Sequence, residues 1–414
     1  MMTPTPLPVA ELSVRFFLDL ALILLAARLC GYAGRRWLGQ PPVVGEMIAG
    51  VLLGPSLLGL AAPALTGFLF PVEIKRLLYV LAQLGVGLYM FIVGLGFDAR
   101  EFRAHRGSAL AVSLSGMAAP FGLALLLAPW LLSLPGLFAP NFTLAQAVLF
   151  TGACISITAF PMLARIIQER GLAGSPLGAL ALAAGAMDDA AAWAVLAIVL
   201  ASFGDGPLVA VKAIGGGLAF AVLMLGPGRR LVGGIARLST DAGLATALIL
   251  FLLAAFLMDW VGMHAVFGGF LLGTAMPRGA FAGQLRARLL PLTVVLLLPI
   301  FFTYSGLNTQ LALVADPALA LVTLTILAAS IAAKFGACWL AARLTGQDQP
   351  TALGIGALMN ARGLMELIII NIGLQRGLIG PPLFAMLVVM AIVTTLMAAP
   401  LFELVQRRPA PAVS

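Results

Sequence analysis

Two adjacent aspartates, Asp188 and Asp189, stand in the middle of the apolar segment AGAMDDAAAWAVLA, residues 184–197. In a low-dielectric environment two neighbouring carboxylates cannot both stay ionised cheaply, so at least one should hold a proton near neutral pH. An ionised carboxylate also offers hard oxygen ligands to a small cation. Adjacent residues on a helix point about 100° apart, so the two need not share one role. A site that holds either a proton or a cation, but not both, is the minimal chemistry of an antiporter.

A few further ionisable residues lie well within apolar segments: Glu46, Lys334, Arg362 and Glu366. Each costs about 2.5–3.5 kcal/mol at the centre of a membrane helix, so such groups normally face a partner or a cavity and mark an ion pathway. A structural ion-pair network between helices is the alternative explanation. Because Lys334 is the only lysine deep within an apolar segment, we expect one aspartate to pair with it while the other faces a cavity.

Two apolar segments are interrupted by helix-breaking and small polar residues. The first, SITAFPMLARIIQERG, contains Pro161, and the second, ALMNARGLMELIIINIG, contains Gly363. Either residue alone could mark an ordinary kink. Interrupted segments at corresponding, oppositely oriented positions of two halves instead indicate the binding site of a transporter.

Polar side chains surround both interruptions. Ser156 and Thr158 precede the first break, where their hydroxyls and the freed backbone carbonyls could coordinate a cation. Asn360 lies beside the second break. Arg362 and Glu366 stand four residues apart, a spacing suited to an ion pair on one helix face. We predict that this pair fixes the ends of the broken helix and does not bind the transported ion.

The composition is that of an integral membrane protein. The 414-residue chain is 62% hydrophobic and only 10% charged, with a mean hydropathy of +1.09, whereas soluble domains carry about 25% charged residues. Its apolar segments are long enough to cross a ~30 Å hydrocarbon core as helices, and none shows the alternation of an outer-membrane barrel. We therefore predict an all-α polytopic membrane protein with about thirteen transmembrane helices. The predicted spans are residues 12–30, 43–60, 77–97, 108–133, 143–168, 176–203, 207–226, 241–259, 262–276, 289–307, 317–343, 351–375 and 380–405.

Charge placement gives the expected orientation. Most arginines fall in the odd-numbered connections and in the C-terminal tail, so the positive-inside rule puts the N-terminus outside and the C-terminus in the cytoplasm. The same arginines account for the net charge of +8, and no nucleic-acid partner is expected. Few residues follow the last predicted span, so we expect a single membrane transporter domain over residues 1–414 without a soluble regulatory domain.

Several segments, in this order along the chain, resemble motifs of the second family of monovalent cation:proton antiporters. That family includes Kef-type bacterial systems, bacterial Na+/H+ antiporters and plant cation/H+ exchangers. The matching segments are QPPVVGEMIAGVLLGPSLLG (40–59), SITAFPMLARII (156–167), AGAMDDAAAWAVLA (184–197), GMHAVFGGFLLGTAMPR (262–278) and ALMNARGLMELIIINIGLQRGLI (357–379). The resemblance covers nearly the whole chain.

The resemblance implies an elevator-type homodimer in a bacterial inner (plasma) membrane, built from inverted repeats with two broken, crossing helices. A mobile core would comprise approximately residues 108–203 and 317–405. Dimerisation helices would span approximately 12–97 and 241–307, with a linker helix at 207–226. The partners implied are a monovalent cation, the proton and membrane lipid, and no cofactor is implied.

The resemblance also implies roles for individual residues. Asp189 would be the ion-binding carboxylate, and Asp188 would pair with Lys334. Thr158 would sit at the helix crossover beside the transported Na+ or K+, with Ser156 nearby. Some family members have Asn before the essential Asp, and that has been linked to electroneutral exchange; the Asp-Asp pair here resembles members expected to be electrogenic.

Two other functions are considered. An anion or organic-solute carrier on a related inverted-repeat fold, such as a bile-acid-type symporter, is disfavoured because a pair of carboxylates repels anions. An intramembrane aspartyl protease brings its two aspartates from separate segments, whereas Asp188 and Asp189 are neighbours on one predicted helix and diverge.

Overall fold

The computed structural model describes residues 8–38, 40, 42–96, 106–172, 175–203, 207–263 and 265–406. Over these ranges the chain is helical, and its one isolated antiparallel bridge joins Phe138 and Ile379. Eight helical segments of the described chain are long and apolar enough to cross a membrane. They are Val44–Ala61, Val72–Gly96, Gly107–Ser133, Val211–Arg237, Thr240–Val261, Ala280–Gly306, Pro317–Leu344 and Pro381–Val405. The all-helical membrane fold predicted from composition is confirmed, while the number of spans remains a prediction.

The chain divides into two compact units, each made of two stretches of sequence. The first unit comprises Met1–Phe97 and Asp205–Thr309, and the second comprises Asp98–Gly204 and Gln310–Ser414. The first contains the segments predicted for the dimerisation and linker helices, and the second contains those predicted for the core. Those roles remain predictions.

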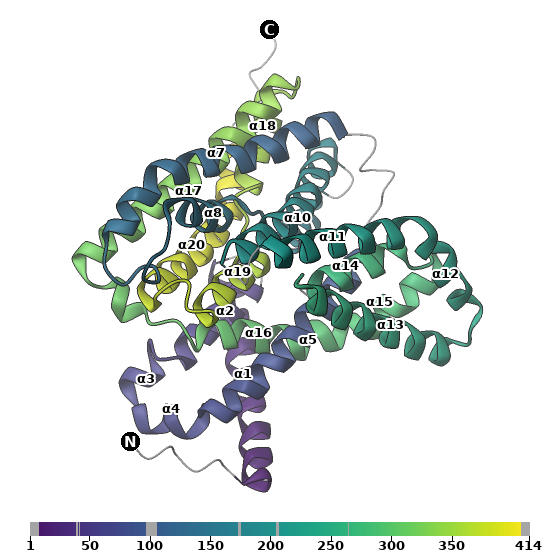
Figure 1. Ribbon diagram of the computed structural model, residues 1–414, viewed down its shortest axis with the longest axis horizontal. Coiled ribbons are helices and arrows are strands. Elements are labelled where there is room, and N and C mark those ends of the chain that lie inside the picture. The colour runs from purple at the N-terminus through teal and green to yellow at the C-terminus, as the bar shows by residue number, and fades with distance from the viewer. Residues whose placement is uncertain are drawn as a thin grey trace. The chain divides into compact units, whose positions relative to one another are not determined.

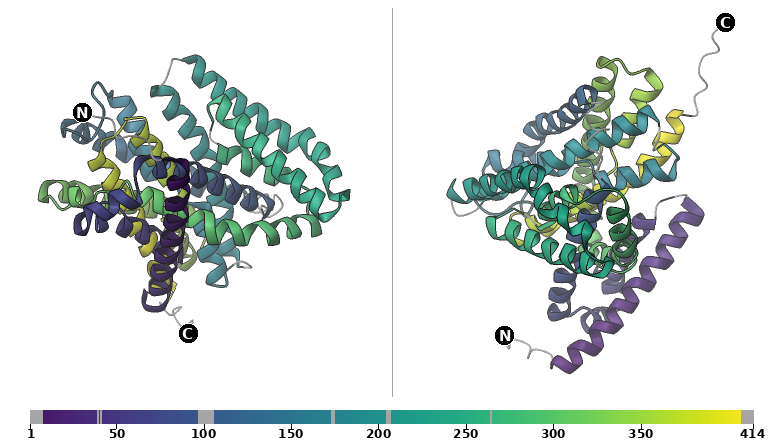
Figure 2. Two further views of the ribbon diagram at one scale, coloured as in Figure 1. Left: turned by 90° about the horizontal axis from the view of Figure 1, so that it is seen from below. Right: turned by 90° about the vertical axis from the view of Figure 1, so that its right-hand side faces the viewer.

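The first unit begins with α1, a single long helix (Figure 2). Its elements are α1 (Val9–Leu38), α2 (Pro42–Leu53), α3 (Leu58–Ala61), α4 (Pro63–Leu69), α5 (Val72–Gly96), α11 (Pro207–Leu223), the π-helical turn η1 (Met224–Gly228), α12 (Arg229–Gly233), the 3₁₀ turn η2 (Gly234–Arg237), α13 (Thr240–Val261), α14 (Ala265–Ala275), α15 (Ala280–Leu292), the π-helical turn η3 (Thr293–Leu297) and α16 (Leu298–Gly306). Helices α5 and α14 pack closely because glycines face each other: a Cβ at Gly94 would lie 2.3 Å from the Phe270 carbonyl oxygen. Small residues allow such close approach between membrane helices.

The second unit holds both broken helices. Its elements are α7 (Arg106–Ser133), α8 (Leu144–Ser156), α9 (Phe160–Glu169), α10 (Pro176–Phe203), the 3₁₀ turn η4 (Leu311–Val314), α17 (Pro317–Leu344), α18 (Gln349–Leu358), α19 (Leu364–Gln375) and α20 (Pro381–Gln406). Helix α7 packs against α8, α10 and α17, and α18 packs against α17 and α20 (Figure 1).

Local sequence signals explain where these helices start. Thr143 caps α8 through a capping box with Gln146, a pattern that satisfies otherwise unpaired backbone donors. Asp316 caps α17, accepting hydrogen bonds from the backbone N–H groups of Ala318 and Leu319. The two caps fix the first turns of α8, which includes Ser156, and of α17, which includes Lys334.

The breaks lie close to the predicted positions, with one correction. Residues 157–159 are non-helical and separate α8 from α9, while Pro161 lies in the first turn of α9 and does not itself break the helix. Proline is tolerated in the first turn because its missing N–H would be unpaired there anyway. Residues 359–363 separate α18 from α19, and Gly363 directly precedes α19, as expected from the sequence.

Several elements of the first unit differ from the prediction. The short helices α4 and α12 and the turn η2 lie outside the predicted spans. The segment predicted as 289–307 belongs to a longer helical stretch, which begins with α15 at Ala280.

Candidate functional site

The two broken helices of the second unit are joined through their non-helical residues. The Ala159 N–H donates to the Ala361 carbonyl over 2.9 Å. The Thr158 hydroxyl donates to the Met359 carbonyl over 2.8 Å. A broken helix leaves backbone groups without partners, and within a membrane these must be satisfied by the protein itself. Each break therefore supplies partners for the other.

Arg362 holds the end of α8. Its guanidinium donates to the carbonyl oxygens of Cys154 at 2.9 Å and Ile155 at 2.5 Å, and also to the Ser330 hydroxyl. The side chain is almost fully buried. A cation at a helix C-terminus is favoured by the helix dipole, so Arg362 neutralises the unpaired end of α8.

The expected Arg362–Glu366 pair is present at long range. The closest nitrogen–oxygen distance is 3.7 Å, and neither Glu366 carboxylate oxygen accepts a hydrogen bond within the described part of the chain. The expectation that both residues share one helix face was wrong, because Arg362 lies in the break before α19; it binds the backbone carbonyls of α8 more closely than it binds Glu366. Beside it, the Asn360 side chain donates to the Gly356 carbonyl over 2.8 Å, while its Oδ1 has no donor among the described residues.

Asp188 and Lys334 meet in the interior of the second unit. Their side chains are 0% exposed, and the Lys334 Nζ lies 2.6 Å from Asp188 Oδ2. The ammonium also donates to the Ser156 carbonyl over 2.5 Å. The second carboxylate oxygen, Oδ1, accepts a hydrogen bond of 2.6 Å from the Ser113 hydroxyl. Four helices, α7, α8, α10 and α17, therefore converge on one buried ion pair, in which both carboxylate oxygens accept hydrogen bonds.

The structure describes the other predicted cation ligands, Ser156, Thr158 and Asp189, to different extents. Ser156 and Thr158 are fully buried, but the Ser156 hydroxyl donates to the Ala153 carbonyl of its own helix. Asp189 belongs to α10, and its side chain lies outside the described residues, as does that of Pro161. The described residues contain no group of three or more His, Cys, Asp and Glu side chains that could hold a metal ion.

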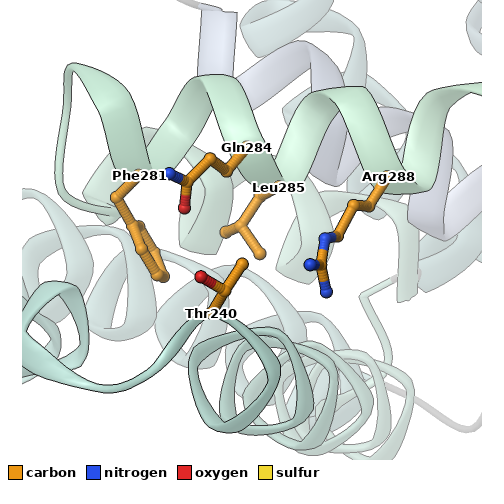
Figure 3. A pocket seen from close by; sticks show the side chains of 5 residues that line it. All are labelled: Thr240, Phe281, Gln284, Leu285 and Arg288. Carbon is orange, nitrogen blue, oxygen red and sulfur yellow. The ribbon is translucent and has the colours of Figure 1, made fainter.

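A shallow surface hollow lies in the first unit, between α13 and α15 (Figure 3). It is lined by Thr240, Phe281, Gln284, Leu285 and Arg288. Arg288 there pairs with the exposed Asp241. None of the predicted site residues borders this hollow.

Two hydroxyls of the second unit were not singled out from the sequence, Ser113 and Ser330. Serines within membrane helices commonly bond their own backbone, so neither residue type is informative alone. Ser330 stands four residues before Lys334, a spacing that places both on one face of α17. Ser113 carries no comparable signal in the sequence.

Comparison with known proteins identifies the family. The family described as "Sodium/hydrogen exchanger, transmembrane" matches residues 23–404. The chain belongs to this sodium/hydrogen exchanger family. A relative of this exchanger, the Na(+)/H(+) antiporter NhaS4 of Synechocystis, is 40% identical over 95% of the chain and 97% of its own length. Cation/H(+) antiporter 17 of Arabidopsis thaliana is 34% identical over 93% of the chain, which spans only 47% of that longer protein.

The fold of the exchanger resembles that of a solved relative. The structure of the sodium proton antiporter MjNhaP1 from Methanocaldococcus jannaschii matches with a TM-score of 0.66 over 96% of the chain and 99% of its own, at 14% identity. The exchanger is thus an integral membrane transporter and not an enzyme, and its activity is cation/proton exchange. Family membership decides against the solute-carrier and protease alternatives.

Proposed function

We propose that this exchanger moves Na+ or K+ against protons by alternating access, with Asp189 binding either the proton or the cation. The name of the Synechocystis relative supports Na+ as a substrate. The name of the plant relative supports a monovalent cation in general.

The proposal depends on different roles for Asp188 and Asp189. Both oxygens of Asp188 are engaged, one by Lys334 and one by Ser113. A carboxylate bound in this way is committed to its ion pair and is poorly placed to exchange ligands. The exchange of proton for cation therefore falls to the neighbouring carboxylate, Asp189.

Oxygen atoms at the crossover supply the remaining cation ligands in this proposal. The Thr158 hydroxyl donates its hydrogen to Met359, and its oxygen keeps lone pairs that can face a cation. The Ser156 hydroxyl also donates its hydrogen and keeps lone pairs, but Ser156 is a weaker candidate because its carbonyl already accepts a hydrogen bond from Lys334. We add Asn360, whose buried Oδ1 lacks a donor within the described ranges. Pro161, Gly363, Arg362 and Glu366 support the crossover and do not touch the ion.

The two compact units support the proposed architecture. The second unit, which contains both broken helices and the Asp188–Lys334 pair, is assigned as the mobile core of an elevator. The first unit, with its closely packed α5 and α14, is assigned as the dimerisation part of a homodimer. The protein is assigned to a bacterial plasma membrane, with its N-terminus outside and its C-terminus in the cytoplasm.

Purified protein in proteoliposomes tests the proposal. With an imposed pH gradient, adding Na+ or K+ should dissipate the gradient, followed by a pH-sensitive dye. Asp189→Asn should abolish this response without lowering the yield of folded protein, whereas Asp241→Asn, at the exposed surface of the first unit, should leave it intact. Lack of response to either cation, or full transport by Asp189→Asn, would refute the proposal.

A further inference from the structure

One end of the first unit carries a cluster of exposed arginines. Residues 224–241 and 276–292 contain six arginines and a single acidic residue, Asp241. The two stretches meet where η2 and the start of α13 approach α15: a Cβ at Gly243 would lie 2.9 Å from the Phe281 ring and 3.7 Å from the Ile235 carbonyl oxygen. This end of the unit is therefore strongly positive. All six arginines are exposed, and together they form the arginine cluster: Arg229, Arg230, Arg237, Arg278, Arg286 and Arg288.

The hollow between α13 and α15 lies within the arginine cluster (Figure 3). Arg288 and Gln284 stand one turn apart on α15 and bring N–H donors to the hollow, and Thr240 brings a hydroxyl from α13. The remaining lining, Phe281 and Leu285, is apolar. None of the five lining side chains carries a negative charge. The hollow therefore suits a ligand that combines anionic oxygens with an apolar part.

The ion pair of Arg288 with Asp241 leaves the arginine able to bind another anion. The Arg288 Nη1 donates to the Asp241 carboxylate, whereas a guanidinium carries five N–H donors. Both side chains are exposed, at 44% and 89%, and exposed ion pairs are weak. The planar fork of arginine also matches the geometry of a phosphate group. A phosphate can therefore bind Arg288 beside Asp241 or in its place.

Exposed leucines stand next to the arginines along the chain. Leu231 directly follows Arg230 and is 74% exposed, and Leu292 lies one turn after Arg288 on α15 and is 54% exposed. Long basic side chains beside exposed apolar ones are typical of the boundary between lipid headgroups and acyl chains. The arginine cluster thus presents charge and apolar surface together, as an amphipathic ligand requires.

We propose that the arginine cluster binds an anionic phospholipid, with Arg288 donating to the headgroup phosphate and the exposed leucines contacting the acyl chains. Charge complementarity supports this occupant, because clusters of basic residues at a membrane surface attract anionic lipids. A second copy of the chain would instead bring the same six arginines to this surface, and like charges repel. The inference goes beyond cation/proton exchange and needs no transport for its test.

The positive-inside rule offers a simpler explanation for arginines at one end of membrane helices. They would then set the topology without binding a lipid. The two explanations differ at the hollow, because topology depends on how many basic residues a connection carries and not on where one guanidinium points. Removing Arg288 should therefore weaken lipid binding more than removing an exposed arginine elsewhere in the first unit.

Native mass spectrometry of the purified protein in detergent measures lipid binding directly. Phosphatidylglycerol should bind more tightly than phosphatidylethanolamine with the same acyl chains, because only the first carries a net negative charge. Arg288→Gln should weaken phosphatidylglycerol binding about fivefold, and Arg237→Gln together with Arg288→Gln about 25-fold. Gln284→Arg adds a guanidinium to the hollow and should strengthen binding about fivefold, a gain that a folding defect cannot produce.

Arg36→Gln is the matched control, because Arg36 is an exposed arginine in the last turn of α1, in the same unit. It should leave the affinity for phosphatidylglycerol unchanged, and inorganic phosphate should not displace the lipid. Equal losses in Arg36→Gln and Arg288→Gln would trace binding to general surface charge and overturn the proposal. Equal binding of phosphatidylethanolamine, or displacement of the lipid by inorganic phosphate, would overturn it as well.

Discussion

Removing the charge of Lys334 should leave Asp188 as an uncompensated buried carboxylate. Lys334→Met keeps much of the side-chain volume, so the change isolates the charge from packing. In the native protein the ammonium makes two short hydrogen bonds, to Asp188 and to the Ser156 carbonyl. Removing one partner of a buried pair typically costs about 3–5 kcal/mol.

Protonation limits this cost and makes it depend on pH. The stranded Asp188 can take up a proton, and protonating an ordinary aspartate with a pKa of about 3.9 costs about 4 kcal/mol at pH 7. That cost falls by about 1.4 kcal/mol for each unit by which the pH is lowered. We therefore expect Lys334→Met to lose about 4 kcal/mol of unfolding free energy at pH 7 and between about 1 and 2 kcal/mol at pH 5.

Denaturation in mixed micelles at the two pH values measures these free energies. The double variant Asp188→Asn with Lys334→Met carries neither charge, so it should recover most of the loss and show little pH dependence. A deficit in Lys334→Met that is equal at pH 5 and pH 7 would refute the reasoning, because it would trace the loss to packing and not to a stranded charge.

Two more predictions concern other contacts. Arg362→Lys should lower the unfolding free energy by about 2–4 kcal/mol, because a single ammonium cannot reach both α8 carbonyls and the Ser330 hydroxyl as the arginine fork does. An unchanged unfolding curve would contradict the role of Arg362 in joining the broken helices. Gly94→Ala should destabilise the protein by about 1–3 kcal/mol, because its Cβ would collide with the Phe270 carbonyl. The control Gly107→Ala on α7, which has open space around it, should be neutral or slightly stabilising. Equal melting temperatures for the two variants would show that α5 and α14 can separate without loss of stability.

The sequence was most informative at charged residues in apolar segments, because burying a charge without a partner costs much free energy. A lone lysine and a pair of aspartates in apolar segments need partners, so a contact between Lys334 and one aspartate was expected from burial alone; the assignment of that aspartate as Asp188 came from the family resemblance. Helix positions were also predictable, because hydrophobic length and Gly or Pro punctuation limit where a membrane helix can begin and end. The site of the first break was displaced, since Pro161 lies in the first turn of α9 and the break precedes that helix.

What the sequence did not reveal are contacts between helices far apart along the chain. The four-residue spacing of Arg362 and Glu366 indicated a pair on one helix, yet the shorter hydrogen bonds of Arg362 go to carbonyls of α8. Spacing reports neighbours within a helix and carries no information about a backbone carbonyl 208 residues earlier. Ser113 was missed for the same reason, because its partner is defined only by the packing of α7 against α10.

The joining of the two breaks has a consequence for how the chain is made. Carbonyls at the buried end of α8 accept hydrogen bonds from Arg362, while the Thr158 hydroxyl and the Ala159 N–H donate to the carbonyls of Met359 and Ala361. Until residues 334 and 362 have been translated, the carbonyls at the end of α8 lack the Lys334 and Arg362 side chains that bind them in the folded protein. The first break can therefore reach its final hydrogen bonding only after the second break has been synthesised. A chain truncated before residue 359 would lack these partners and is expected not to complete the fold of the second unit.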